Sequence, residues 1–166
     1  MDVSIRSESA ADSAAIEALT AAAFLNASHT SHTEQHIVNA LRTAGQLSIS
    51  LVAESRGILV GHVALSPISI SDGSTGWFGL GPISVLPQFQ CRGIGSQLMR
   101  EALERLRDQG AEGCVVLGEP AYYGRFGFRA DPRLTLAGVP PEYFQALSFA
   151  TSRAQGRVTY HPAFDV

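Results

Sequence analysis

Apolar and polar residues recur with two different periods along the chain, and this predicts where strands and helices lie. The alternating run Val3–Ile5 predicts a short first strand. Apolar residues at helical spacing then predict two helices. The first begins after the cap residue Asp12, and the second ends at Gly45. The polar segment 26–33 between them predicts a loop.

From Leu47 onward the pattern is typical of strands. The runs Leu47–Glu54 and Leu59–Ile70 flank Ser55-Arg56-Gly57, a sequence that predicts a hairpin turn. A second turn at Asp72–Ser74 precedes a third long strand, Trp77–Val85. These three runs predict an antiparallel meander.

The strongest helix in the sequence follows the segment Gln90–Gly95 and stops at Gly110. Its apolar positions form one stripe: Ile94, Leu98, Met99, Ala102, Leu103 and Leu106. The wholly apolar run Cys114–Leu117 then predicts a strand that is buried on both faces and parallel to Trp77–Val85.

The remaining chain predicts a short helix after Ala121 and strands near Gln145–Thr151 and Arg157–Tyr160. The order of elements predicts an α/β fold: one domain over residues 1–166 with a mixed, largely antiparallel sheet flanked by helices. Pro82 cannot donate to a ladder, so it indicates either an ordinary edge strand or a splayed central parallel pair.

Composition and charge limit the classes of function. The 166 residues are 45% hydrophobic and 16% charged, which is typical of a folded globular protein. No apolar stretch is long enough for a membrane span, and the start lacks a secretory signal, so we expect a cytoplasmic protein. A net charge of −3 disfavours a nucleic-acid partner.

The chain contains twelve basic residues, and all of them are arginines. The absence of lysine from the sequence excludes Schiff-base catalysis, pyridoxal phosphate attachment and the lysine of a P-loop. An anionic ligand must therefore be held by arginine, backbone N–H groups and helix termini.

Gln90-Cys91-Arg92-Gly93-Ile94-Gly95 has the features of a phosphate loop at a helix start. The two glycines let backbone approach phosphate oxygens, and Arg92 adds a fixed positive charge. A dinucleotide fingerprint is disfavoured because Leu98 stands where its third glycine belongs. Taken alone, the same glycines are also compatible with a simple tight turn.

Histidines and cysteines do not form a convincing metal or redox site. His32 and His36 are one helical turn apart, and His29 lies nearby, but Glu34 is misplaced for a metalloprotease motif. Cys91 and Cys114 have no metal-ligand spacing. We therefore expect no metal.

A combination of motifs resembles the N-acetyltransferase (GNAT) superfamily. It comprises a strand ending Ile83–Pro87, the pattern Gln-x-x-Gly-x-Gly, an amphipathic helix, a short apolar strand and the late Tyr-x-x-x-Gly-Phe at Tyr123–Phe128. The resemblance spans roughly residues 3–130, with core motifs in 76–130. Leu117–Tyr123 and Tyr160–Phe164 resemble the YhbS-like bacterial branch of predicted acetyltransferases.

This resemblance implies acetyl-CoA as cosubstrate and assigns roles to particular residues. The strand segment Ile83, Ser84 and Val85 would hold the pantetheine arm through its backbone. The amides of Cys91, Arg92, Gly93, Ile94, Gly95 and Ser96 would bind the pyrophosphate, bordered by Gln90 and the Arg92 side chain. Many relatives carry arginine at the place of Gln90. Tyr123 would protonate the departing thiolate, while its neighbour Tyr122 packs.

The implied activity is transfer of an acetyl group to a primary amine by direct attack on the thioester. The amine is left open between a small molecule, a peptide N-terminus and a protein lysine. The general base is also open, and each candidate is expected to be a solvated surface residue: Glu34, Glu54, Glu119, His32 and His62. A chain of waters is a further alternative to a side-chain base. The alternative is a non-catalytic acyl-CoA sensor. Dimers are common in this superfamily, and the apolar segment after Val139 is a candidate contact for a homodimer.

Overall fold

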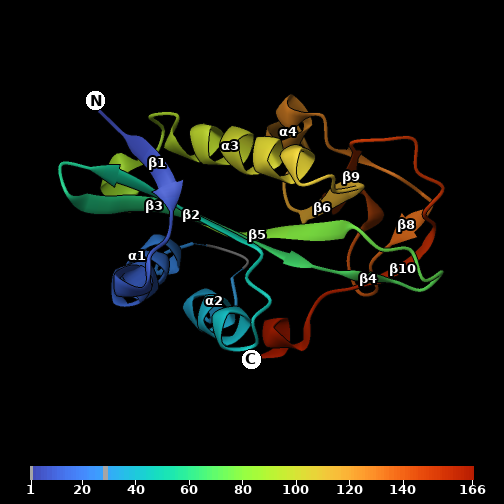
Figure 1. Cartoon of the computed structure of the whole chain (residues 1–166), viewed down its shortest axis with the longest axis horizontal. Helices are drawn as coiled ribbons and strands as arrows, with labels where there is room; N and C mark the ends of the chain where they lie inside the picture. Colours follow the sequence, from blue (N-terminus) through green and yellow to red (C-terminus); the bar gives the residue numbers. More distant parts are fainter. Residues whose placement is uncertain (1, 28–29) are drawn as a thin grey trace. The chain divides into compact units, whose positions relative to one another are not determined.

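The computed structural model describes residues 2–27 and 30–166 (Figure 1). The chain forms two compact units. The first comprises the chain up to Leu65 together with Gly81–Ala102 and Pro162–Val166, and the second comprises Ser66–Leu80 and Leu103–His161. Strand β5 (Trp77–Val85) and helix α3 (Ile94–Asp108) each begin in one unit and end in the other.

The first unit is built on antiparallel strands β1 (Ser4–Ser7), β2 (Ile49–Ser55) and β3 (Ile58–Pro67). Ser4 pairs with Glu54, and Ile49 pairs with Leu65. The turn between β2 and β3 holds Arg56 at φ 53° and Gly57 at φ 77°. Two left-handed residues in a two-residue hairpin match the right-handed twist of the strands, so the predicted hairpin is confirmed.

Two helices cover one face of these strands, and the start of α3 covers the other (Figure 1). They are α1 (Ser13–Phe24) and α2 (Glu34–Thr43). Ile16 of α1, Val38 of α2 and Val52 of β2 form one buried cluster. On the opposite face a Cβ at Gly61 would lie 2.9 Å from Leu98 Cδ1, so α3 packs directly on the β3 backbone there.

The second unit holds the predicted parallel pair. In β5 and β6 (Gly113–Leu117), Trp77 pairs with Gly113 and Gly79 with Val115. Strand β9 (Phe144–Ser148) lies antiparallel to β6, and β7 (Arg129–Ala130) follows on its other side. The unit also contains α4 (Pro120–Tyr123) and a three-stranded sheet ordered β4 (Ser69–Ile70), β10 (Gly156–Thr159) and β8 (Leu134–Thr135).

Three sequence-based predictions need correction. The run Leu59–Ile70 is not one strand, because β3 ends at Pro67 and Ile70 belongs to β4, which pairs with β10. The strand predicted near Gln145–Thr151 begins one residue earlier and stops at Ser148. The run Cys114–Leu117 is buried except for its last residue, Leu117, which is 43% exposed.

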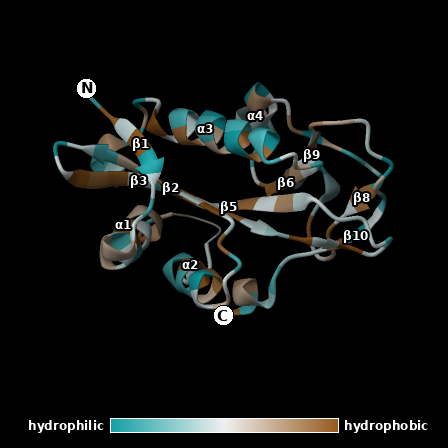
Figure 2. Ribbon diagram, in the orientation of Figure 1, coloured by the Kyte–Doolittle hydropathy of each residue, from teal (hydrophilic) through white to brown (hydrophobic). Residues whose placement is uncertain are grey.

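Helix α3 has the amphipathic character that its sequence predicts. Its ribbon alternates between hydrophilic and hydrophobic colour in Figure 2. Beyond its end, Gly110 adopts φ 79°, and the Ala111 amide bonds to the Leu106 carbonyl oxygen at 3.0 Å. This left-handed glycine closes the helix as predicted. Among the described residues, no helix is both long and apolar enough to cross a membrane. The single domain over residues 1–166 stays a prediction.

Candidate active site

The segment Gln90–Ser96 spans the start of α3, which begins at Ile94. The Gln97 amide bonds to the Gly93 carbonyl oxygen at 3.0 Å. The amides of Ile94, Gly95 and Ser96 therefore lie in the first turn, where a helix offers them no acceptor. The positive end of the helix dipole lies at the same place and favours an anion.

Two residues of this loop adopt left-handed backbone conformations, Cys91 at φ 62° and Gly93 at φ 82°. A Cβ placed on Gly93 would meet nothing within 4 Å, so the glycine is required by its backbone angle and not by crowding. Both residues are exposed. Such turns line up successive amides into a concave anion site.

Side chains around the loop add positive charge. The Arg92 guanidinium lies 5.4 Å from the centroid of the Phe89 ring. A hollow of about 650 Å³ beside the loop is lined by both Arg92 and Arg56. The full lining is Asp2, Ser55, Arg56, Ile58, Phe89 and Arg92. Arg56 is missed by sequence reasoning, because it reaches the loop from the β2–β3 turn.

Gln90 has a structural partner that the sequence does not reveal. Its Nε2 donates to the Val85 carbonyl oxygen at 3.0 Å. This bond ties the phosphate loop to the end of β5. The side chain of Gln90 thus helps to hold the loop in place.

The segment of β5 that was predicted to hold pantetheine lies in the first unit. Ile83 and Val85 are half-buried, and Ser84 between them is only 3% exposed. Pairing of β5 with β6 runs from Trp77 to Gly79, so these three residues lie beyond the paired part. The first unit therefore brings together the phosphate loop and the predicted pantetheine strand.

Tyr123 lies in the second unit, at the end of α4. Its amide bonds to the Glu119 carbonyl oxygen at 3.1 Å. Its ring makes an edge-to-face contact with Tyr122, with centroids 5.0 Å apart, and a Cβ on Gly118 would collide with it. Burial, with a smaller contribution from Tyr122, raises the pKa of Tyr123 to about 12. The phenol therefore keeps its proton at neutral pH. Tyr122 packs, as predicted.

The candidates for the general base differ in their surroundings. His32 and Glu119 are exposed. Glu34 is half-buried and accepts a hydrogen bond from Thr30, and Glu54 pairs with Arg6 at 3.1 Å. Among these four, Glu34 Oε1 is buried without a hydrogen-bond partner in the described part of the chain, whereas the other three groups are exposed or paired.

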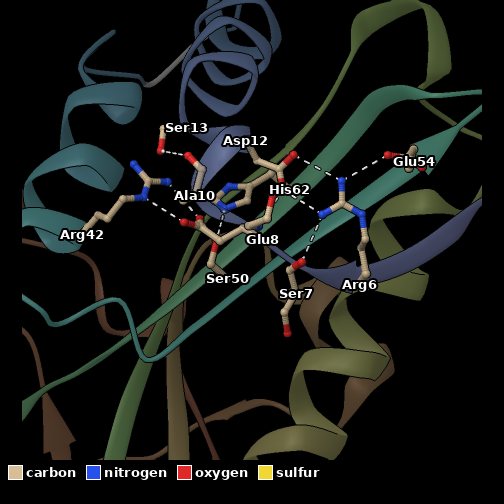
Figure 3. A network of polar contacts seen from close by, with 11 residues as sticks. Arg6, Ser7, Glu8, Ala10, Asp12, Ser13, Arg42, Ser50, Glu54 and His62 are labelled. Atoms are coloured by element: carbon tan, nitrogen blue, oxygen red, sulfur yellow. Dashed lines mark hydrogen bonds and ion pairs between the residues drawn. The ribbon is translucent and has the colours of Figure 1, made fainter.

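The prediction that His62 is a solvated surface residue is wrong. His62 lies in β3 and is 0% exposed. Its Nε2 is 2.8 Å from Ser50 Oγ, which also donates to the Glu8 carboxylate (Figure 3). Arg42 in turn donates to both oxygens of Glu8, at 2.8 and 2.9 Å.

The charges around His62 fix the direction of each pKa. Burial lowers the pKa of His62 to about 4, although Glu8 opposes that change. Burial also disfavours the ionised form of Glu8, but hydrogen bonds from Arg42 and Ser50 outweigh it and lower its pKa. The network thus contains a neutral imidazole and an ionised carboxylate at neutral pH.

Metal-ligating side chains do not gather in the part of the chain that is described. Within residues 2–27 and 30–166 no three His, Cys, Asp or Glu side chains are placed to hold an ion. His29 lies outside the described residues. Cys91 is exposed and Cys114 is buried, and burial raises the pKa of the Cys114 thiol.

A glycine-rich helix start that follows a β-strand on a mixed α/β sheet is compatible with a coenzyme-dependent acyltransferase. The comparisons with known proteins agree with that class. The acetyltransferase (GNAT) family model matches residues 14–128, and the chain belongs to this family. The fold and the enzyme class predicted from the sequence are thereby confirmed.

Particular relatives resemble the chain along nearly its whole length. The uncharacterized N-acetyltransferase YhbS of Escherichia coli K12 is 33% identical, covering 97% of this chain and 98% of that protein. A GNAT family acetyltransferase from Brucella melitensis, solved with acetyl-CoA, is 47% identical with a TM-score of 0.89, covering 99% of both chains. E. coli YhbS, solved with CoA, is 32% identical with a TM-score of 0.90, covering 99% of this chain and 92% of that one.

Proposed function

We propose that this protein transfers the acetyl group of acetyl-CoA to the primary amine of a small molecule or peptide, in the cytoplasm. The observation that carries the proposal is the loop at the start of α3. It combines first-turn amides for which a helix has no acceptor, the left-handed residues Cys91 and Gly93, and arginines at 56 and 92. The Brucella melitensis and E. coli relatives were solved with acetyl-CoA and CoA, which supports the same ligand here.

The coenzyme would lie along the elements of the first unit. The amides from Cys91 to Ser96 would bind the pyrophosphate, and Arg92 would add a charge-assisted contact. Arg56, across the same hollow, is suited to a further phosphate of the coenzyme. The backbone of Ile83 and Val85 would pair with the amides of the pantetheine arm.

The reaction requires alignment of the amine with the thioester, stabilisation of the oxyanion and two proton transfers. The amine nitrogen attacks the thioester carbonyl carbon, and a backbone N–H of the β5 segment would stabilise the oxyanion. The C–S bond then breaks with its electron pair on sulfur. Tyr123 would give its phenolic proton to that sulfur as the C–S bond breaks.

A non-catalytic sensor of acyl-CoA is the alternative, and the presence of Tyr123 in the Tyr-x-x-x-Gly-Phe motif favours the enzyme. The test follows release of free CoA thiol from acetyl-CoA with a panel of primary amines. We expect amine-dependent thiol release by the parent protein and a loss of roughly 10²-fold or more in Tyr123→Phe. Tyr122→Phe, which changes the neighbouring packed ring, is the matched control. Tight binding of acetyl-CoA without turnover of any amine would favour the sensor.

A further inference from the structure

The buried chain of Arg42, Glu8, Ser50 and His62 determines which nitrogen of the imidazole carries its proton. Glu8 is paired with Arg42 and ionised, so its oxygens only accept hydrogen bonds. The single hydroxyl hydrogen of Ser50 is used by Glu8, so Ser50 Oγ must accept from His62 Nε2–H. The neutral ring then carries a bare lone pair on Nδ1.

That lone pair has no hydrogen-bond partner among the described residues, and neither has the hydroxyl of Ser84. Both atoms are buried. Because leaving a buried polar atom without a hydrogen-bond partner is unfavourable, these two atoms together point to a shared ligand or water.

Two contacts show that His62 and Ser84 lie opposite each other on neighbouring strands. The Leu86 amide bonds to the Val60 carbonyl oxygen at 2.9 Å, and a Cβ on Gly61 would lie 3.3 Å from the Ser84 carbonyl oxygen. Strands β3 and β5 therefore run antiparallel at this point. Counting two residues from the Leu86–Val60 bond places Ser84 across from His62.

The two side chains also share a face of the sheet. A Cβ on Gly61 would point towards α3. Because side chains of successive residues in a strand point to opposite faces, His62 points to the face covered by α1 and α2. Ser84, across from His62, faces the same side. Ser84 stands between Ile83 and Val85, the backbone to which the proposed function assigns the reacting arm of acetyl-CoA.

We propose that His62 Nδ1 is the proton acceptor of the acetyl-transfer reaction, reached through one water that it shares with Ser84 Oγ. Ser50, Glu8 and Arg42 are positioning residues that hold the ring and its tautomer. This assignment rests on the proposed function, because it names the base of that reaction.

The protons and electrons of the step balance. The C–N bond forms as the amine attacks, and the nitrogen of the adduct becomes an ammonium that is more acidic than the ammonium of the free amine. One of its protons passes through the water to His62 Nδ1, giving an imidazolium. The C–S electron pair goes to sulfur, which takes the proton of Tyr123. The charge of Glu8, two hydrogen bonds away through Ser50, stabilises the imidazolium while it exists.

The first test compares His62→Gln with the parent protein. A glutamine amide can still donate to Ser50, but it cannot take a proton. With saturating acetyl-CoA and methylamine as the acceptor, we expect kcat to fall by roughly 10²-fold or more at neutral pH. The affinity for acetyl-CoA should not change. An unchanged kcat in His62→Gln would overturn the assignment while leaving the acetyltransferase activity standing.

The role of Ser84 can be tested against a matched control, Ser66 of β3. Ser84→Ala removes the partner of the water and should lower kcat by roughly tenfold. Ser66→Ala removes another buried hydroxyl without a described partner and should leave kcat unchanged. Equal rates in both variants would contradict the role of Ser84.

A second measurement does not depend on activity. Nitrogen-15 NMR of the imidazole should show the proton on Nε2 in the parent protein. Ser50→Thr keeps the hydroxyl and should keep this tautomer, whereas Ser50→Ala should give a mixture. A proton on Nδ1 in the parent would overturn the proposal. If the parent binds acetyl-CoA and transfers nothing to any amine of the panel, the amine-transfer function fails, and the NMR result still decides on the tautomer of His62.

Discussion

The buried imidazole of His62 makes the stability of the protein depend on pH in a way that can be calculated. The ring is 0% exposed, and its pKa falls from 6.5 to about 4 on folding. Between pH 4 and pH 6.5 the imidazole is protonated in the unfolded chain and neutral in the folded protein. The contribution of His62 to the free energy of unfolding is therefore at its maximum above pH 6.5 and declines as the pH falls towards 4.

One pKa unit corresponds to about 1.4 kcal/mol, so the whole shift is worth about 3 kcal/mol, and about 2 kcal/mol of this is lost between pH 7 and pH 5. Urea unfolding of the parent and of His62→Gln at these two pH values measures the difference. The variant should lose about 2 kcal/mol less than the parent on acidification.

A matched variant separates this effect from other titrating groups. His36→Gln changes an exposed histidine of α2, and it should lose as much stability as the parent on acidification. If His62→Gln also loses as much as the parent, burial of a neutral imidazole is refuted as a source of acid sensitivity.

Three further substitutions probe the packing, the coenzyme site and the acid. Gly61→Ala places a Cβ 2.9 Å from Leu98 Cδ1, so overpacking should cost about 1–3 kcal/mol in urea unfolding, and no loss would show that α3 can move away. Arg56→Ala should weaken the binding of acetyl-CoA by roughly fivefold at low salt and by less at high salt. An unchanged dissociation constant would show that Arg56 does not contribute to the site. Tyr123→Phe should leave the acetyl-CoA dissociation constant unchanged while turnover falls, and weaker binding would indicate a structural role instead.

Elements with strong periodicity could be predicted well from the sequence. The strand Trp77–Val85 matches β5 at both ends, and α3 ends before the predicted Gly110. Local pattern and turn chemistry determine such elements. Strands β4, β7 and β8 have two residues each and depend on pairing with distant strands, so no local period marks them.

The candidate site was predictable in part for the same reason. The phosphate loop is contiguous, so its residues could be named from one motif. The network around His62 draws on four distant segments, those that hold Glu8, Arg42, Ser50 and His62, and no spacing connects them. One signal was present: a single histidine inside the apolar run of β3 favours a buried ring over a solvated one.

The central claim is that the loop at the start of α3 binds the phosphates of acetyl-CoA, and calorimetric titration tests it most directly. Gly93→Glu adds a side chain and a negative charge at φ 82°, where a Cβ meets nothing. Gly138→Glu makes the same change at another glycine with φ 82° and open surroundings, outside the loop. We predict saturable binding by the parent and by Gly138→Glu, and none by Gly93→Glu. Undiminished binding by Gly93→Glu, or no binding by the parent, would contradict the account.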